Sequence, residues 1–139
     1  MTKTKDRQFA VVEKQFQYKG HECTCVFTRN GYRCGYVSTT LYRDCSDFDI
    51  DCHWGLSFAG MLPREYAPKG AWYIGFDCGH CEDGIDTKSA YDYGLIDEAT
   101  KERFDKSFWY LKDYPVKDVE YVVEQCKKIV DQLEALEKR

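Results

Sequence analysis

The sequence predicts an α+β fold, in which an antiparallel sheet of about five strands carries one long C-terminal helix on one face. Three observations support this prediction. Short apolar runs alternate with turn signals in the first part of the chain, the last quarter follows a helical period, and 139 residues is the usual size of one domain. We therefore expect a single domain over residues 1–139, with residues 1–8 as a flexible N-terminus.

Five segments are rich in the β-branched and aromatic residues that strands favour. They cover residues 9–17, 22–29, 32–38, 50–58 and 71–78. Asn30-Gly31 separates the second and third segments and favours a tight hairpin, because both central positions of such a turn need a positive φ. The stretches 39–49 and 59–70 predict irregular connections, the second because it contains Pro63 and Pro68.

The C-terminal segment predicts a helix from about residue 116 to 137. Pro115 suits the beginning of a helix. Apolar residues then recur at helical spacing: Val119, Val122, Val123, Cys126, Ile129, Val130, Leu133 and Leu136. Charged residues fill the other face, so the apolar stripe should pack on the sheet. A shorter helix is predicted around residues 97–105.

The composition excludes several classes of function. The net charge of −4 gives no basic surface for nucleic acid or anionic lipid. No apolar run approaches the ~20 residues of a membrane span. The first residues, Met1 to Arg7, lack the apolar core of a secretion signal. We therefore expect a cytoplasmic protein that binds neither nucleic acid nor membrane.

Eight cysteines would suit disulfides, but the expected cytoplasmic compartment is reducing. Most of them lie in strand-like segments or on the apolar helix face, where free cysteine acts as a small buried apolar residue. Cys78-Gly79-His80-Cys81 has the Cys-x-x-Cys spacing of redox proteins. The acidic residues that follow it would raise a thiol pKa, which disfavours redox catalysis.

Zinc is the stronger alternative for this segment, because Cys78, His80 and Cys81 could be joined by Cys52 and His53. The chain has no second Cys-x-x-Cys to complete a common structural site. We therefore predict no metal site and no cofactor. The sequence also contains no Gly-rich phosphate loop and no His-Glu-x-x-His motif.

A ligand pocket is the remaining interpretation of the polar residues around strand ends. The candidate ligand-binding residues are Arg33, Tyr36, His53, Trp54, Trp72, Asp77, His80 and Asp83. Aromatic rings can stack on a base, arginine binds phosphate, and aspartate accepts ribose hydroxyls. We expect Arg33, His53 and His80 to converge at one edge of the sheet. The structural alternative makes the aromatic residues core, His53 a satisfied strand histidine, and Arg33 the partner of an acid.

Four segments in this order resemble a family of small phage and prophage proteins. They are Gly31-Tyr32-Arg33-Cys34-Gly35-Tyr36-Val37, His53-Trp54-Gly55-Leu56-Ser57-Phe58, Trp72-Tyr73-Ile74-Gly75-Phe76-Asp77-Cys78-Gly79-His80 with Asp83, and Glu120-Tyr121-Val122-Val123-Glu124-Gln125-Cys126. The family pattern reads G-[HY]-R-C-G-Y-V, H-G-G-[LI]-[ST]-[FY]-S, W-[WY]-[FI]-G-F-D-C-[AG]-H-x-x-D and Y-V-x-x-[EQ]-C. The chain departs from it at Trp54, where glycine is usual, and Cys81 falls at a variable position.

The resemblance implies a phage accessory protein that counters host defence inside the infected bacterial cell. Some proteins of this kind sequester nucleotide signals such as cyclic ADP-ribose isomers or cyclic dinucleotides. Together with the candidate pocket, this predicts a nucleotide-binding protein without catalytic residues, which could form a homo-oligomer. Two alternatives stay open. One is a hydrolase of a nucleotide or related metabolite, with His80 or His53 as general base and Asp77 orienting it. The other is an interaction module that inhibits a host enzyme.

Overall fold

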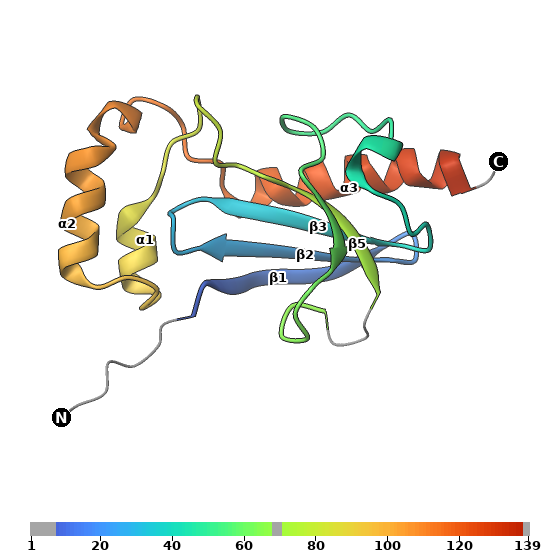
Figure 1. The fold of residues 1–139 in the computed structure, drawn as a ribbon, viewed down its shortest axis with the longest axis horizontal. Coiled ribbons are helices and arrows are strands. Elements are labelled where there is room, and N and C mark those ends of the chain that lie inside the picture. Colours follow the sequence, from blue (N-terminus) through green and yellow to red (C-terminus); the bar gives the residue numbers. More distant parts are fainter. Residues whose placement is uncertain (1–7, 68–70, 138–139) are drawn as a thin grey trace.

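A five-stranded antiparallel sheet forms the centre of the computed structural model, which describes residues 8–67 and 71–137 (Figure 1). The strands are β1 (Ala10–Tyr18), β2 (His21–Thr28), β3 (Arg33–Thr39), β4 (Phe58–Met61) and β5 (Trp72–Asp77). Their order in the sheet is β1-β2-β3-β5-β4, with antiparallel neighbours throughout. The predicted fold class is confirmed. Residues 1–7 of the predicted flexible N-terminus lie outside the described residues.

A hairpin turn joins β2 and β3, as predicted, but of the Asn30-Gly31 pair only Gly31 has a positive φ. Gly31 has a φ of +87°, and its amide donates to the Thr28 carbonyl at 3.0 Å. The Gly31 carbonyl in turn accepts the Asp86 amide at 2.8 Å. A Cβ at Gly31 would lie only 3.2 Å from that amide nitrogen, so glycine is needed for the close approach as well as for the positive φ. The hairpin thereby fixes the segment that follows β5.

The long helix α3 (Val119–Glu137) covers one face of the sheet, as predicted. Figure 1 shows it running behind the strands. Its buried residues are Val122, Val123, Cys126, Ile129, Val130 and Leu133. The helix packs tightly at Gly35 of β3, where an added Cβ would lie 2.8 Å from the Cys126 sulfur. None of the described helices is both long and apolar enough to cross a membrane.

Two shorter helices pack at the end of the sheet beside the β2–β3 turn (Figure 1). Helix α2 (Glu98–Ser107) agrees with the prediction around 97–105, whereas α1 (Thr87–Asp92) was not predicted. Each begins with an aspartate cap: Asp86 accepts the Ser89 amide, and Asp97 accepts the Thr100 amide. Phe27 joins Ala90, Leu95 and Ile96 in a second apolar cluster that holds the two helices to β2. After α2 the chain forms the short 3-10 turn η2 (Trp109–Leu111).

The predicted strand over residues 50–58 is wrong. Only Phe58 belongs to a strand, and β4 continues to Met61, into a stretch predicted to be irregular. Side chains of α3 bind the backbone amides of residues 51 and 53, whereas the Ser57 amide donates to the Gly75 carbonyl of β5 at 2.9 Å. Gln132 accepts the Asp51 amide at 2.7 Å, and Gln125 accepts the His53 amide at 2.8 Å. The alternation of polar and apolar residues therefore reflects a segment lying along the helix.

We predict that Ile129→Asp unfolds the protein. Ile129 is fully buried between α3 and the sheet, and an unpaired charge there should lower the free energy of unfolding by more than about 4 kcal/mol. The matched control is Ala135→Asp, which places the same charge at an exposed position of α3 and should cost at most about 1 kcal/mol. Chemical denaturation followed by circular dichroism measures both. Equal stability of the two variants would show that α3 is not part of the core.

Candidate functional site

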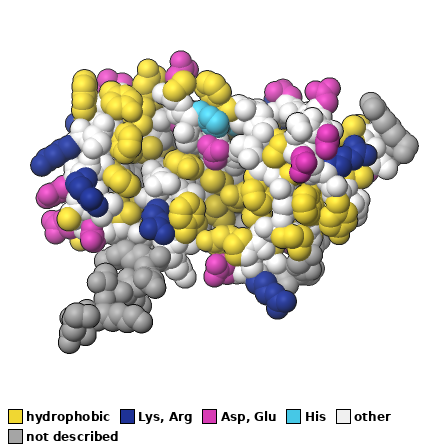
Figure 2. Space-filling model, in the orientation of Figure 1, with side chains coloured by type: hydrophobic (Ala, Val, Ile, Leu, Met, Phe, Trp, Pro, Cys, Tyr) yellow, Lys and Arg dark blue, Asp and Glu magenta, His cyan; other side chains and the backbone are white. Residues whose placement is uncertain are grey.

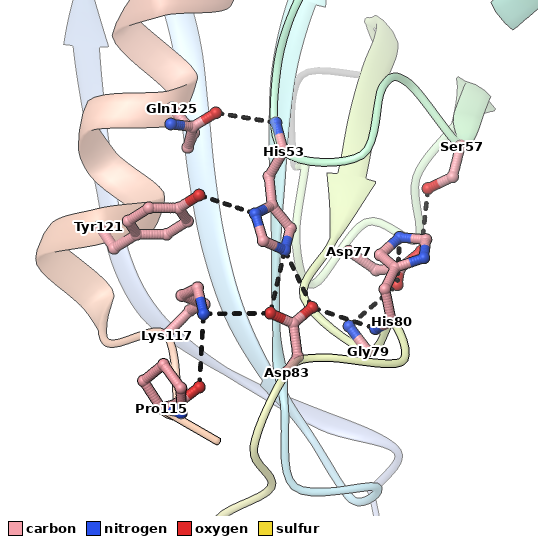
Figure 3. Close-up of polar contacts among 10 residues, drawn as sticks. All are labelled: His53, Ser57, Asp77, Gly79, His80, Asp83, Pro115, Lys117, Tyr121 and Gln125. Carbon is pink, nitrogen blue, oxygen red and sulfur yellow. Dashed lines mark hydrogen bonds and ion pairs between the residues drawn. The ribbon is translucent and has the colours of Figure 1, made fainter. Parts of the chain in front are cut away.

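Asp83 is the buried centre of a polar network beyond the end of β5 (Figure 3). Its side chain is only 2% exposed. Its carboxylate accepts a hydrogen bond from His53 Nε2 at 2.9 Å and from the His80 amide at 3.0 Å, and it lies 3.2 Å from Lys117 Nζ. One side chain therefore joins the segment before β4, the loop after β5 and the segment that leads into α3.

Electrostatics keep this buried carboxyl ionised. Burial by itself would raise the pKa of Asp83. The hydrogen bonds from His53 and from the His80 amide, with the positive charge of Lys117, outweigh burial, so the pKa of Asp83 lies below its ordinary value. The folded protein therefore favours the ionised form of Asp83 more strongly than the unfolded chain does. Asp83 stabilises the fold at neutral pH.

His53 uses both of its ring nitrogens within this network. Because an ionised carboxylate can only accept, Nε2 carries the proton that faces Asp83. In the neutral ring Nδ1 then accepts from the Tyr121 hydroxyl, which lies 2.7 Å away. The Tyr121 ring also meets the imidazole edge-on, with centroids 5.3 Å apart. His53 is therefore a buried, fully engaged link between α3 and Asp83, with no free nitrogen to act as general base.

His80 is the more accessible histidine of the site. Its ring stacks on the exposed Trp54, with centroids 5.0 Å apart and an interplanar angle of 14°. Its Nε2 lies 3.3 Å from Asp77 Oδ1. The two atoms are close enough to attract but are not aligned as a hydrogen bond, and no other described atom satisfies this buried nitrogen. Asp77 itself accepts from the Ser57 hydroxyl at 3.0 Å and from the Gly79 amide at 3.1 Å.

Local backbone geometry places these two histidines side by side. Trp54 and Gly55 both have positive φ values, 57° and 79°, and they turn the chain directly after His53. On the other side, Gly79 lets the loop after β5 approach the Tyr32 ring, since a Cβ there would lie 2.6 Å from a ring carbon. As a result, the centroids of the His53 and His80 rings lie 6.1 Å apart.

A cavity of about 300 Å³ opens beside His80 and Asp83. Three parts of the chain line it: the β2–β3 turn, the loop after β5, and the region from α2 to η2. The lining residues are Asn30, Tyr32, Gly79, His80, Asp83, Ile85, Phe104, Phe108 and Leu111. Most of the side chains in the wall are aromatic or aliphatic, and the polar side chains are those of Asn30, His80 and Asp83. A volume near 300 Å³ with few polar groups is at the small end of the range for ligand sites.

Five of the eight predicted site residues come together in this region: His53, Trp54, Asp77, His80 and Asp83 (Figure 3 draws all but Trp54). Arg33 does not join them. Its Nε and Nη2 donate to the Glu13 carboxylate at 2.6 and 3.2 Å, and its Nη1 donates to the Lys117 carbonyl at 3.0 Å. The predicted convergence of Arg33 with His53 and His80 is therefore not found, because a buried acid already binds the guanidinium in bidentate form.

Tyr36 and Trp72 also lie elsewhere. Tyr36 is on the face of the sheet opposite α3, where its ring meets Phe58 edge-on at 5.3 Å. Figure 2 shows this face, on which hydrophobic side chains gather over the sheet. Trp72 begins β5, so it stands about 17 Å along the strand from Asp77. Its Nε1 donates to the Arg43 carbonyl at 3.1 Å.

Sequence reasoning missed the residues that complete the site from the helical side. Phe104, Phe108 and Leu111 line the cavity from α2 and η2, in a region with no clear pattern in the sequence. Tyr121 and Gln125 support His53 from α3. A signal for these two did exist, because both lie in the segment 120–126 that contributes to the resemblance.

The cysteines are mostly core residues, as predicted. All eight are free thiols, and six are buried: Cys23, Cys25, Cys34, Cys52, Cys78 and Cys126. Burial raises the pKa of Cys23 to about 12 and that of Cys52 to about 11. Burial likewise raises the pKa of Cys78, so these thiols stay protonated at neutral pH. Among the described residues, Cys78 and Cys81 belong to no group of three clustered metal ligands.

Comparisons with protein-family models, with curated proteins and with solved structures give no match to this chain.

We predict that Asp83→Asn destabilises the protein by about 3–5 kcal/mol at pH 7. The substitution removes the buried carboxylate that compensates the positive charge of Lys117. The folded-state pKa of Asp83 is lowered, so its contribution is complete above about pH 4 and is lost as the pH falls through that lowered pKa. Denaturation curves should therefore show the difference between wild type and variant shrinking in acid. Asp49→Asn, at an exposed position, is the control and should change little. A constant difference down to pH 2 would contradict the assignment.

We predict that Cys81→Ser leaves the free energy of unfolding within about 0.5 kcal/mol of wild type, because the Cys81 side chain is exposed. Cys78→Ser should instead cost more than about 1 kcal/mol, since it puts a hydroxyl into the buried core. Thermal denaturation under reducing conditions compares the two. A similar loss in both variants would indicate that the pair acts together.

Proposed function

We propose that the protein binds and sequesters a small ligand with an aromatic heterocycle, and that this ligand is a nucleotide signal. The cavity beside His80 carries the proposal. Tyr32, Phe104 and Phe108 line the cavity and would contact a base, and only three of the lining side chains are polar. A base–aromatic contact is worth about 1–3 kcal/mol. Asn30 and His80 also line the cavity, and in this proposal their polar groups select among bases by hydrogen bonding.

The cavity should recognise the base more than the phosphates. Arg33 is held by Glu13, and no lysine or arginine is among the residues that line the cavity. The phosphate groups of a bound nucleotide would therefore extend toward solvent. This favours ligands whose binding depends on the base, such as a cyclic nucleotide with few charges, over triphosphates that need a cationic cradle.

The biological role follows from the resemblance to phage accessory proteins. In that setting the ligand would be a signal of the bacterial host's defence, such as a cyclic ADP-ribose isomer or a cyclic dinucleotide. The protein would lower its free concentration in the cytoplasm of the infected cell. Such a role requires tight binding but no chemistry, which suits a site whose buried histidine has no free nitrogen.

A second candidate function is hydrolysis of the bound nucleotide. The proximity of His80 Nε2 to Asp77 Oδ1, at 3.3 Å, favours it, because a carboxylate close to an imidazole stabilises the charge that a general base acquires. His53 does not act as the base in this proposal, since both of its ring nitrogens are engaged. His80 would act on a water molecule, with Asp77 as the residue that positions it.

Thermal-shift screening against nucleosides, nucleotides and cyclic dinucleotides tests the proposed function. A ligand at 100 times its Kd adds about 2.7 kcal/mol to stability. The active ligand should lose about fivefold or more of its affinity in Phe108→Ala, since about 1–3 kcal/mol of stacking is removed. Trp109→Ala is the matched control, because Trp109 is the neighbouring residue, is 66% exposed and does not line the cavity.

The fate of the ligand separates the two candidate functions. Heat denaturation after incubation should release intact nucleotide from a sequestering protein and product from a hydrolase. In the second case His80→Gln should abolish product while the affinity changes little. If no compound in the screen raises the melting temperature, or if Phe108→Ala and Trp109→Ala weaken binding equally, the cavity is not the site.

A further inference from the structure

A second group of polar side chains lies at the other end of α3, away from the cavity. His21 begins β2, and Glu134 and Glu137 lie in the last turns of α3. Figure 1 shows that β2 begins at the end of the molecule where α3 finishes. Tyr121 and Glu134 are thirteen residues apart on one helix, which corresponds to about 20 Å. This group is therefore separate from the candidate ligand site.

The three side chains meet as metal ligands would. His21 Nε2 lies 3.0 Å from Glu134 Oε1 and 3.5 Å from Glu137 Oε2. All three ligand atoms lie within 4.8 Å of one another. In a tetrahedral zinc site with bonds of about 2.0–2.1 Å, neighbouring ligand atoms stand about 3.3 Å apart. The two measured distances lie on either side of that value.

Further hydrogen bonds orient two of the three ligands. His21 Nδ1 lies 2.6 Å from the Ser38 carbonyl oxygen, so Nδ1 carries a proton and donates to it. In the neutral ring this leaves a lone pair on Nε2, which points at the two carboxylates. The buried Thr39 hydroxyl donates to Glu137 Oε1 at 3.0 Å, which leaves Oε2 toward His21. Outer contacts of this kind are typical of protein zinc sites.

We propose that His21, Glu134 and Glu137 bind a divalent zinc ion, with water as the fourth ligand. One neutral imidazole and two carboxylates balance the charge of the ion. The side chain of His21 is 8% exposed, whereas those of Glu134 and Glu137 are 27% and 21% exposed, so the ligands are sheltered but open on one side. The bound ion would fasten the end of α3 to the beginning of β2.

This site differs from the zinc alternative in the sequence analysis, whose ligands would come from Cys52, His53, Cys78, His80 and Cys81. No metal site was predicted from the sequence, because it contains neither a second Cys-x-x-Cys nor a His-Glu-x-x-His motif. His21 is 113 residues from Glu134 along the chain, so only the packing of α3 on β2 brings them together. The competing explanation is an ion pair in which a protonated His21 is held by the two carboxylates. The two explanations make different predictions for added zinc.

Zinc titration of the Cys81→Ser variant tests the proposal, because this background removes the exposed thiol that could bind zinc independently. Calorimetry should give one zinc ion per chain, and the melting temperature should rise with zinc but not with magnesium. Adding Glu134→Gln and Glu137→Gln together should weaken zinc binding by roughly tenfold or more. Asp131→Asn is the matched control, since Asp131 lies on the same helix and pairs with Lys19 instead, and it should leave the affinity unchanged.

X-ray absorption at the zinc edge provides a measurement that does not depend on the variants folding. The zinc-loaded protein should show only nitrogen and oxygen neighbours, with the scattering pattern of one imidazole. Absence of saturable binding, unchanged affinity in the double glutamine variant, or sulfur in the first coordination shell would each overturn the proposal. In the first case the ion pair of His21 with the two glutamates would be the correct description.

Discussion

The hydrogen bond between His53 and Asp83 is the interaction on which the arrangement of the candidate site depends. A carboxylate that is 2% exposed cannot stay ionised without partners. Asp83 obtains them from three separate segments, through His53, the His80 amide and Lys117. If one partner were lost, the charge of Asp83 would stay in a low-dielectric environment without full compensation. The three segments are therefore held together or released together. The cavity wall formed by His80 is fixed by the same contacts.

Close packing gives the other constraint. Gly35 admits the sulfur of Cys126, Gly79 admits the ring of Tyr32, and Gly31 admits the backbone of Asp86. Each contact joins two of the elements that surround the site: β3 with α3, the loop after β5 with the hairpin, and the hairpin with α1. Two of these contacts join residues 31–37 to residues 120–126 and to the loop that follows β5. Tyr121 and Gln125, both within residues 120–126, hold His53.

The strongest local signals in the sequence predicted the fold. The Asn30-Gly31 turn, the apolar period of α3 and the strand composition of β1, β2, β3 and β5 depend on short-range physics. A strand was wrongly predicted over residues 50–58. The amides of Asp51 and His53 bond instead to Gln132 and Gln125, more than seventy residues away. No local pattern distinguishes such a segment from an edge strand, since both alternate buried and exposed side chains.

The site was partly predictable for the same reason. Asp77, His80 and Asp83 follow one strand, so their proximity is a local property of the chain. The position of the Arg33 guanidinium depends on its ion pair with Glu13. Glu13 lies in β1 at the point where the register of pairing with β2 shifts. The aromatic wall from α2 and η2 depended on how those helices pack. Pairings of this kind are decided by tertiary structure, and a single sequence does not specify them.

Native-state hydrogen exchange at the His80 amide tests the central claim most directly, because that amide donates to Asp83 at 3.0 Å. If Asp83 holds the loop after β5 as part of the cooperative fold, the amide should exchange only through an opening whose free energy approaches that of global unfolding. Amides in the core of β3 serve as the reference. Exchange of the His80 amide at the rate of an open loop, while the β3 amides stay protected, would contradict the account.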